Sequence, residues 1–336
     1  MNAEPLLQIR RLGVTYRQGR RLITALDGVD LEIAAGETLS VVGESGSRKT
    51  TLGNAVLGLV PPSRGTIFFA GEDITSTRPR HLTRDIQVVF QDPHGSLNPV
   101  RTIGQTLEEP LLAHRRLSRA QRRAEVVVAL ERVGLDSAAA SRYPAQFSGG
   151  QLQRIAIARA LMLSPRLVVC DEAVSALDLS IQAQILNLLS RLQHELGLSY
   201  LFISHDLAVV RHFSDRVAVF YRGRLMEVGT AAQVCERPDH PYTQALLAAA
   251  PVPDPAEQRL RRQTDVASID VAASDDAGCP FRARCSYARD LCARPLPVHR
   301  TAYGQVACHR FGELGFDTVS EHRLLLPAGQ RSRSPA

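Results

Sequence analysis

The segment that decides the fold of this chain reads Gly43-Glu44-Ser45-Gly46-Ser47-Arg48-Lys49-Thr50, and we call it the phosphate loop. An apolar run, Leu39 to Val42, precedes it as a predicted strand, and residues from Thr51 to Leu59 follow it with apolar side chains at helical spacing. A Gly- and Ser-rich loop between a strand and a helix directs backbone N–H groups at a phosphate. Lys49 can then reach the β- and γ-phosphates of a nucleotide, and Thr50 can hold Mg²⁺. The sequence therefore predicts a nucleotide site on an α/β fold.

Arg48 departs from this pattern, which asks for a glycine immediately before the lysine. A glycine there lets the backbone approach the phosphate closely, and a Cβ with a long side chain threatens that approach. Two interpretations remain open. In the first, the Arg48 side chain swings out and leaves a slow but working site. In the second, the site binds nucleotide poorly and serves mainly as a scaffold.

Length and composition exclude several classes of protein. With 336 residues, 44% of them hydrophobic, the chain can bury a sizeable core and is expected to contain more than one unit. Stretches without charged residues, such as Thr50 to Ser63, are shorter than the roughly 20 apolar residues that a bilayer requires. The first residues lack the apolar run of a secretory signal, so we expect a cytoplasmic protein whose six cysteines are reduced or metal-bound.

The charged residues also carry information. The formal net charge is +6 and the pI is about 9.2, but both signs are mixed along most of the chain, so nucleic acid is not an expected partner. Of the 40 basic residues, only Lys49 is a lysine, and the others are arginines. Because the chain uses arginine wherever either cation would serve, this lysine indicates a site that needs a compact ammonium group.

The order of predicted elements favours a largely parallel sheet covered by helices. Residues 1–45 read as short strands, and the charged, helical pattern of residues 101–143 favours an inserted helical subdomain. Further along, we expect strands at 167–170, 200–204 and 217–221 and a helix at 181–196 that ends before Gly197. A Pro-, Ala- and Asp-rich stretch beyond residue 251 predicts a linker, which a cysteine-bearing unit follows.

Two carboxylates end the apolar strand that begins near Arg166. Asp171 can bind in the Mg²⁺ shell, and Glu172 can orient and deprotonate an attacking water. Such a pair is most often solvated when it stands alone, but the phosphate loop about 120 residues upstream favours the catalytic interpretation.

A further motif, Phe147-Ser148-Gly149-Gly150-Gln151 followed by LQRIAIARAL, resembles the signature of ATP-binding-cassette (ABC) ATPases. The resemblance implies a P-loop NTPase (RecA-like) core with an antiparallel β subdomain and a helical subdomain inserted at about 92–155. It divides the chain into a nucleotide-binding domain, 1–250, and a small cysteine-bearing C-terminal extension, 251–336. It also implies that two cassettes sandwich two ATPs, with the signature of each facing the γ-phosphate held by the other.

The resemblance assigns roles to residues outside these motifs. Gln91 in VFQDP becomes the Q-loop residue, and His205 in FISHD becomes the switch histidine that braces the γ-phosphate beside the base Glu172. The resemblance implies that Tyr16 stacks on the adenine, although an isolated tyrosine at a strand end is more often a packing residue. It also places Asp178 in the D-loop, residues 175–178. The implied ATP-binding residues are Tyr16, Gly43 to Thr51, Gln91, Ser148 to Gln151, Asp171 and Asp178. The implied Mg²⁺ ligands are Thr50, Gln91 and Asp171.

Other motifs resemble the ATPases of oligopeptide and dipeptide importers, namely SLNP at 96–99 and HPYT at 240–243. The likeness runs from about residue 7 to about residue 310 and is nearest to the second ATPase subunit of such importers. It implies a heterodimer with another ATPase subunit, two transmembrane permease subunits and, indirectly, an extracytoplasmic peptide-binding protein. The expected location is the cytoplasmic face of the cell (inner) membrane. Besides Arg48, the chain departs from the family at Ala173, where proline commonly follows the glutamate.

Two alternative functions remain. Arg48 suggests a catalytically weak subunit that binds nucleotide and completes a heterodimeric ATPase. A DNA-repair cassette ATPase would suit the basic pI, but those proteins carry long coiled coils or zinc insertions between the phosphate loop and the signature. Only about 100 residues separate the two motifs here.

Four cysteines, Cys279, Cys285, Cys292 and Cys308, fall within the C-terminal extension. Four thiolates can hold a [4Fe–4S] cluster or a tetrahedral zinc ion, and five, six and fifteen intervening residues suit zinc less well than tight Cys-x₂₋₄-Cys pairs do. Unliganded cysteines remain a third interpretation. The resemblance to peptide-importer ATPases implies the cluster. His299 and His309 are alternative ligands, although surface positions are the simpler interpretation for both.

Overall fold

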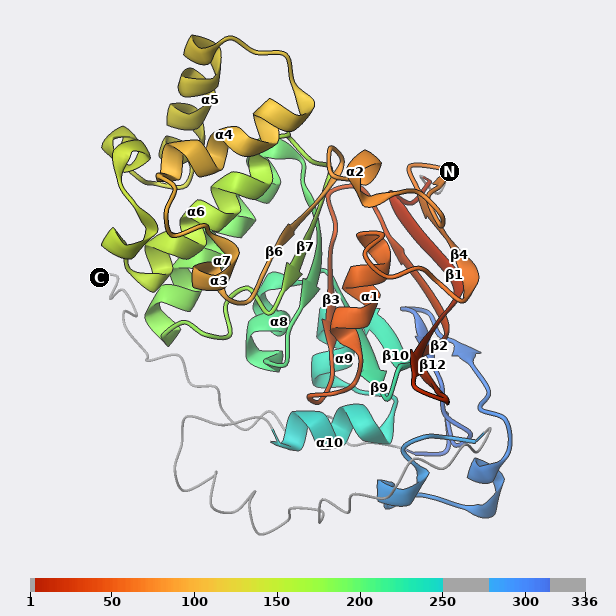
Figure 1. The fold of residues 1–336 in the computed structure, drawn as a ribbon. Coiled ribbons are helices and arrows are strands. Elements are labelled where there is room, and N and C mark those ends of the chain that lie inside the picture. Colours follow the sequence, from red (N-terminus) through yellow and green to blue (C-terminus); the bar gives the residue numbers. More distant parts are fainter. Residues whose placement is uncertain (1–3, 250–277, 315–336) are drawn as a thin grey trace, which may run out of the picture.

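The computed structural model of the chain describes residues 4–249 and 278–314, which form two β-sheets and the helices that pack against them (Figure 1). None of the helices in these two ranges combines the length and the hydropathy that crossing a bilayer requires. The predicted linker beyond residue 251 lies outside the described residues.

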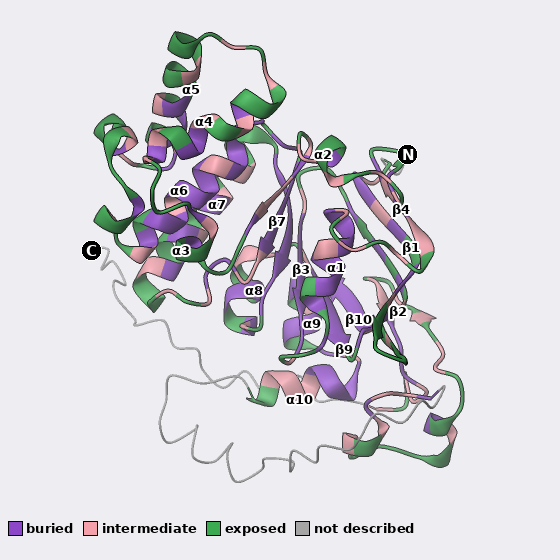
Figure 2. Cartoon of the chain, viewed as in Figure 1, coloured by how far each residue is buried: buried purple, intermediate pink, exposed green. Residues whose placement is uncertain are grey.

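The larger sheet has eight strands. In spatial order they are β11 (His299–Arg300), β12 (Gln305–Val306), β10 (Arg224–Thr230), β9 (Arg216–Tyr221), β3 (Thr38–Val42), β8 (Ser199–Ile203), β7 (Leu167–Asp171) and β6 (Ile86–Val89). The five from β9 to β6 are parallel, as the sequence predicts. Parallel strands are buried on both faces. Every residue of β3 is buried (Figure 2), and so is every residue of β8. The carboxyl ends of β3, β7 and β8 therefore meet at one edge, where α/β sheets bind ligands.

Alternate residues of these strands face two different apolar cores. In β7, Val168 and Cys170 belong to the core shared with the mostly helical segment 103–163, which we call the core beneath the helical part. Leu167 and Val169 belong to the other core, which includes the smaller sheet. Because side chains alternate along a strand, one apolar run supplies both layers.

The smaller sheet is antiparallel, in the order β2 (Arg21–Ile33), β1 (Leu7–Gln18), β4 (Arg64–Phe69) and β5 (Glu72–Asp73). The strand-rich opening predicted for residues 1–45 contributes β1 and β2. The sequence reasoning did not single out β4 and β5. Only two of the six residues of β4 are buried and both residues of β5 are exposed, so neither strand has the continuous apolar run that marks the central strands.

The helices are α1 (Lys49–Val56), α2 (Pro79–Leu82), α3 (Pro93–Ser96), α4 (Ile103–His114), α5 (Arg119–Arg132), α6 (Gly149–Leu161), α7 (Leu179–Leu196), α8 (Leu207–Phe213), α9 (Ala231–Glu236) and α10 (Pro241–Ala249). Short 3₁₀ turns are η1 (Ser137–Ser141), η2 (Pro144–Gln146), η3 (Arg282–Arg284) and η4 (Asp290–Ala293). The helical pattern at 101–143 becomes α4 and α5, each of which begins with a reciprocal capping box. Helix α7 ends at Gly197, whose left-handed φ of 65° favours glycine.

The cysteine-bearing extension continues the larger sheet. Strand β12 pairs antiparallel with β10, opposing Val306 to Glu227 and Gln305 to Val228. Phe281 is 4% exposed and belongs to the core beneath the helical part. The extension, in blue in Figure 1, therefore packs directly on the cassette beside β10 and α10.

Candidate functional site

The phosphate loop wraps tightly between β3 and α1. Gly43 has a φ of 152°, and a Cβ on it would lie 2.2 Å from the Phe220 carbonyl oxygen, so this position needs glycine. Lys49 is 5% exposed, and its Nζ donates to the carbonyl oxygens of Gly43 at 2.8 Å and Glu44 at 3.1 Å. Burial lowers the pKa of Lys49, and nearby carboxylates, Glu172 first among them, oppose that shift. The ammonium group thus lies inside the loop that a phosphate would occupy.

The remaining loop residues divide into buried and exposed ones. Ser47 is buried, and its backbone N–H donates to the Glu44 carbonyl oxygen at 3.1 Å, while Thr51 is buried in the first turn of α1. Ser45, Gly46 and Thr50 are exposed.

Arg48 is the residue just before α1, with φ 76° and ψ 24°. This left-handed conformation costs roughly 1–2 kcal/mol for a residue with a Cβ, which agrees with the glycine expected there. The Arg48 side chain is exposed, whereas the neighbouring Lys49 is buried. The Arg48 side chain is therefore not packed inside the loop as Lys49 is, and both interpretations of Arg48 stay open.

The predicted metal and water carboxylates lie beside the phosphate loop. Thr50 Oγ1 donates to Asp171 Oδ1 at 3.2 Å, and burial raises the pKa of Asp171. Glu172 follows at the end of β7 with a left-handed φ of 49°, and its Oε2 lies 3.5 Å from His205 Nδ1. The sequence-predicted Thr50, Asp171, Glu172 and His205 are thus brought together at the carboxyl edge of the sheet.

Gln91 joins the same site through a serine. Gln91 Nε2 donates to Ser175 Oγ at 3.2 Å, and Ser175 Oγ donates to the Glu172 carbonyl oxygen at 2.9 Å. This chain of hydrogen bonds places the Q-loop next to the strand end that carries both carboxylates. Ser175 was expected only as part of the D-loop, and no sequence pattern indicated its contact with Gln91.

Most of the chain is similar to known proteins. A family model for ABC transporters matches residues 26–175, and a model for the C-terminal region of oligopeptide/dipeptide transporters matches residues 226–292. The oligopeptide transport ATP-binding protein OppF of Salmonella typhimurium is 48% identical over 84% of this chain and 86% of its own length. The chain belongs to the ABC transporter family.

A further relative and a solved structure support the same family for this ABC protein. The dipeptide transport ATP-binding protein DppF of Escherichia coli is 47% identical over 91% of this chain and 94% of its own. A solved structure, the dimeric post-hydrolysis state of the ATP-binding cassette MJ0796 bound to ADP and Pi, aligns with a TM-score of 0.61 at 31% identity. It covers 67% of this chain and 98% of that cassette. The P-loop NTPase fold predicted from the motifs is therefore confirmed.

The ABC signature lies apart from the phosphate loop of its own chain. Ser148 precedes α6, and its Oγ accepts the Gln151 N–H at 3.4 Å, while the Gln151 side chain accepts the Ser148 N–H. Helix α6 packs in the core beneath the helical part, whereas α1 packs in the other core. Asp178 precedes α7, and Tyr16, 37% exposed, lies on β1.

Two residues that the sequence reasoning did not place at the site contact the phosphate loop of this cassette. The Glu44 N–H donates to Tyr242 Oη at 3.0 Å, and the Glu44 carboxylate binds Arg284. They lie 198 and 240 residues from Glu44 in the sequence, so no local spacing indicates them. The only signal for Tyr242 was its HPYT motif.

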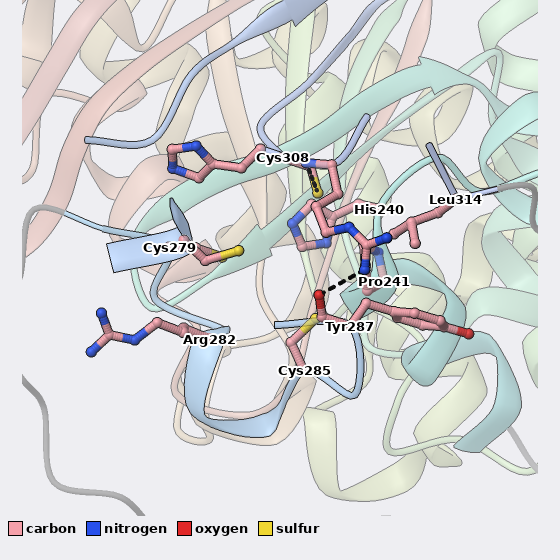
Figure 3. Close-up of a pocket in the computed structure, with 11 residues that line it drawn as sticks. His240, Pro241, Cys279, Arg282, Cys285, Tyr287, Cys308 and Leu314 are labelled. Atoms are coloured by element: carbon pink, nitrogen blue, oxygen red, sulfur yellow. Dashed lines mark hydrogen bonds between the residues drawn. The ribbon is translucent and has the colours of Figure 1, made fainter. Parts of the chain in front are cut away.

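The four cysteines of the extension line one small cavity (Figure 3). All four are free thiols, and burial raises the pKa of Cys279 to about 12 and also raises those of Cys285 and Cys308. Within the described ranges, no group of three or more His, Cys, Asp or Glu side chains is close enough to hold a metal ion. The cavity therefore gathers a suitable set of sulfur donors without assembling them in a ligand geometry.

The two histidines near the cysteines differ. His309 lines the cavity, and its Nε2 lies 3.1 Å from the Arg294 carbonyl oxygen. His299 stacks on Phe311 with ring centroids 5.3 Å apart.

Proposed function

We propose that this chain is the ATP-binding subunit of a peptide importer of the ABC type, which couples ATP binding and hydrolysis to translocation through membrane permeases. The observation that carries the proposal is the convergence of Lys49, Thr50, Asp171, Glu172 and His205 at one edge of the sheet. Its substrate class rests on the match of residues 226–292 to oligopeptide/dipeptide transporters and on relatives named for oligopeptide and dipeptide transport.

The proposed mechanism uses this chain's own side chains in an in-line attack of water on ATP. Glu172 takes a proton from the water while the water oxygen bonds to the γ-phosphorus. The bond between the γ-phosphorus and the β–γ bridging oxygen breaks, and ADP leaves with that oxygen. Lys49 exchanges its two loop carbonyls for phosphate oxygens, and His205 braces the γ-phosphate. The oxygens of Thr50, Asp171 and Gln91 suit a hard cation and would hold Mg²⁺, which neutralises phosphate charge when bound.

The remaining functional residues are proposed to act in a dimer of cassettes. Ser148, Gly149, Gly150 and Gln151 would complete the ATP site of the partner, since the start of α6 can hold an anion. Asp178 would act at the same interface, and Tyr16 would stack on the adenine of its own site. We propose a heterodimer with a second ATPase subunit, two permeases and, indirectly, a peptide-binding protein, at the cytoplasmic face of the membrane. The proposed domains are 1–250, with a helical insertion at 92–155, and 251–336.

The proposed function predicts ATP-driven peptide uptake. In proteoliposomes that hold the permeases and both ATPase subunits, with the peptide-binding protein added, uptake of short peptides should require MgATP and this chain. Omitting the chain, or replacing ATP by a non-hydrolysable analogue, should abolish uptake. Peptide uptake that continues without this chain would contradict the proposal.

For the extension, we propose that Cys279, Cys285, Cys292 and Cys308 hold a [4Fe–4S] cluster that fastens the segment, with zinc as the alternative. The support is the gathering of all four thiols on one cavity, together with the sequence resemblance. Burial raises the pKa of the Cys279 thiol, so this thiol would need a cation beside it to ionise near neutral pH.

Anaerobically purified protein should therefore be brown and contain about four iron atoms per chain. Serine at all four cysteine positions should remove the colour, whereas serine at Cys170, buried in β7, should keep it. One zinc per chain by elemental analysis would replace the cluster, and protein free of both metals would leave the thiols unliganded.

A second candidate function is favoured by one observation, the left-handed Arg48. In this alternative the chain binds nucleotide weakly and contributes mainly its signature to a partner's site.

A further inference from the structure

One residue of the phosphate loop is held from the opposite end of the chain. Arg284 Nη1 donates to Glu44 Oε2 at 2.8 Å, and Arg284 Nη2 donates to Glu44 Oε1 at 2.9 Å. Two parallel hydrogen bonds between a guanidinium group and a carboxylate give a geometry that is both strong and specific. The two side chains are 24% and 40% exposed, so water screens this pair less than an ion pair at the open surface.

The Arg284 side chain is itself fixed by an aromatic cluster. Its guanidinium carbon lies 5.6 Å from the Phe281 ring centroid and 6.0 Å from that of Tyr221 in β9. The Phe281 ring packs 5.2 Å from Tyr242 and 5.4 Å from Tyr221. An arginine that stacks on aromatic faces loses less side-chain freedom when it binds a carboxylate. Arg284 is thus already oriented toward Glu44.

The backbone of Glu44 is held from the same direction by Tyr242, whose Oη accepts the Glu44 N–H. Tyr242 lies in the first turn of α10, and a buried carboxylate, Glu227 of β10, holds the two residues just before that helix. Glu227 accepts the N–H of Asp239 at 2.8 Å and the N–H of His240 at 3.1 Å. Both the carboxylate and the amide of Glu44 therefore depend on residues beyond the nucleotide motifs.

Glu44 connects these contacts to the phosphate-binding lysine. Its carbonyl oxygen is one of the two backbone acceptors of Lys49 Nζ. A shift of Glu44 would change the position of Lys49 and of the loop amides beside it. At the other end, Arg284 closes the 3₁₀ turn η3 and directly precedes Cys285 in the sequence. Cys285 lines the cysteine cavity (Figure 3).

We infer that Arg284 is a positioning residue of the ATP site, which holds the phosphate loop through Glu44 and so makes nucleotide affinity depend on the cysteine-bearing extension. This inference rests on the proposed function, because it assumes that the loop binds ATP. Since coupling between two sites is reciprocal, nucleotide bound at the loop should also stabilise the turn that carries Arg284.

Equilibrium binding of a fluorescent ADP analogue to the full chain with Mg²⁺ tests the inference. Arg284→Gln should weaken binding about fivefold or more, and Arg284→Lys should restore part of the loss. Arg289→Gln is the matched control, because it removes the same charge from the extension at a more exposed pair with Glu313. Its affinity should equal that of the wild type.

A double-mutant cycle separates positioning through Glu44 from a general loss of stability. In a Glu44→Gln chain, adding Arg284→Gln should weaken nucleotide binding no further. Glu44→Gln alone leaves the extension intact, so it tests the pair even if Arg284→Gln folds poorly. Additive losses in the double variant would overturn the inference.

Hydrogen exchange without nucleotide gives a readout that does not depend on the proposed function. Amides of residues 43–49 should exchange faster in Arg284→Gln than in Arg289→Gln. A wild-type chain that binds no nucleotide would refute the proposed function, while the exchange difference would still support Arg284 as the residue that holds the loop. Equal exchange and equal binding in the two variants would overturn the inference.

Discussion

Glu172→Gln is expected to leave MgATP bound and to lower hydrolysis at the site built on this chain's phosphate loop about 10²–10⁴-fold. The substitution keeps the size of the side chain, whose Oε2 lies 3.5 Å from His205 Nδ1. It removes the group that accepts the proton of the attacking water. Single-turnover hydrolysis by the assembled complex, measured beside nucleotide affinity, checks both parts of the expectation.

Glu195→Gln provides the matched control for this experiment. Glu195 pairs with Arg191 on the exposed side of α7, so the same chemical change there should leave turnover as in the wild type. A Glu172→Gln complex that hydrolyses ATP at the wild-type single-turnover rate would refute Glu172 as the base.

Lys49→Ala is expected to lower ATP turnover by the assembled complex about 10²–10³-fold, a loss typical of removing one group that stabilises transition-state charge. Lys49 is the only ammonium side chain of the protein, and it already lies within hydrogen-bond distance of the loop carbonyls. The measurement is steady-state hydrolysis with the corresponding lysine of each ATPase subunit changed in turn.

This experiment also decides between the two interpretations of Arg48. Arg48→Gly, which puts the usual residue before the lysine, serves as the control and should retain turnover. If Lys49→Ala changes little while the partner's lysine is essential, the chain is the catalytically weak subunit. Its contribution would then be the signature, residues 148–151.

Much of the fold could be predicted because its central elements have strong local patterns. The apolar runs of β3, β7, β8 and β9 match their buried positions, and α7 ends where Gly197 permits a left-handed turn. Strands β11 and β12 were not predicted, because two-residue strands have no pattern of their own. Strand β12 finds its hydrogen-bond partners on the edge of β10, and β11 finds its own on β12.

The parts of the candidate site that lie in short local motifs could be predicted from the sequence, whereas the contacts between distant residues could not. The phosphate loop and the Asp171-Glu172 pair each occupy a few consecutive residues, and the fold brings Thr50 to Asp171. By contrast, the left-handed backbone of Glu172 leaves no mark in the sequence, since nothing there distinguishes it from an ordinary glutamate at a strand end. The contact between Arg284 and Glu44 depends on the packing of the whole extension.

The pairing of β12 with β10 has a consequence for how the protein is made. Strand β10 lies between β9 and β12, so its outer edge stays open until residues 305–306 leave the ribosome. An open strand edge is a template for pairing with other chains. A message truncated after residue 250 would therefore yield a cassette with an uncovered edge, and self-association in the cell would be its expected fate.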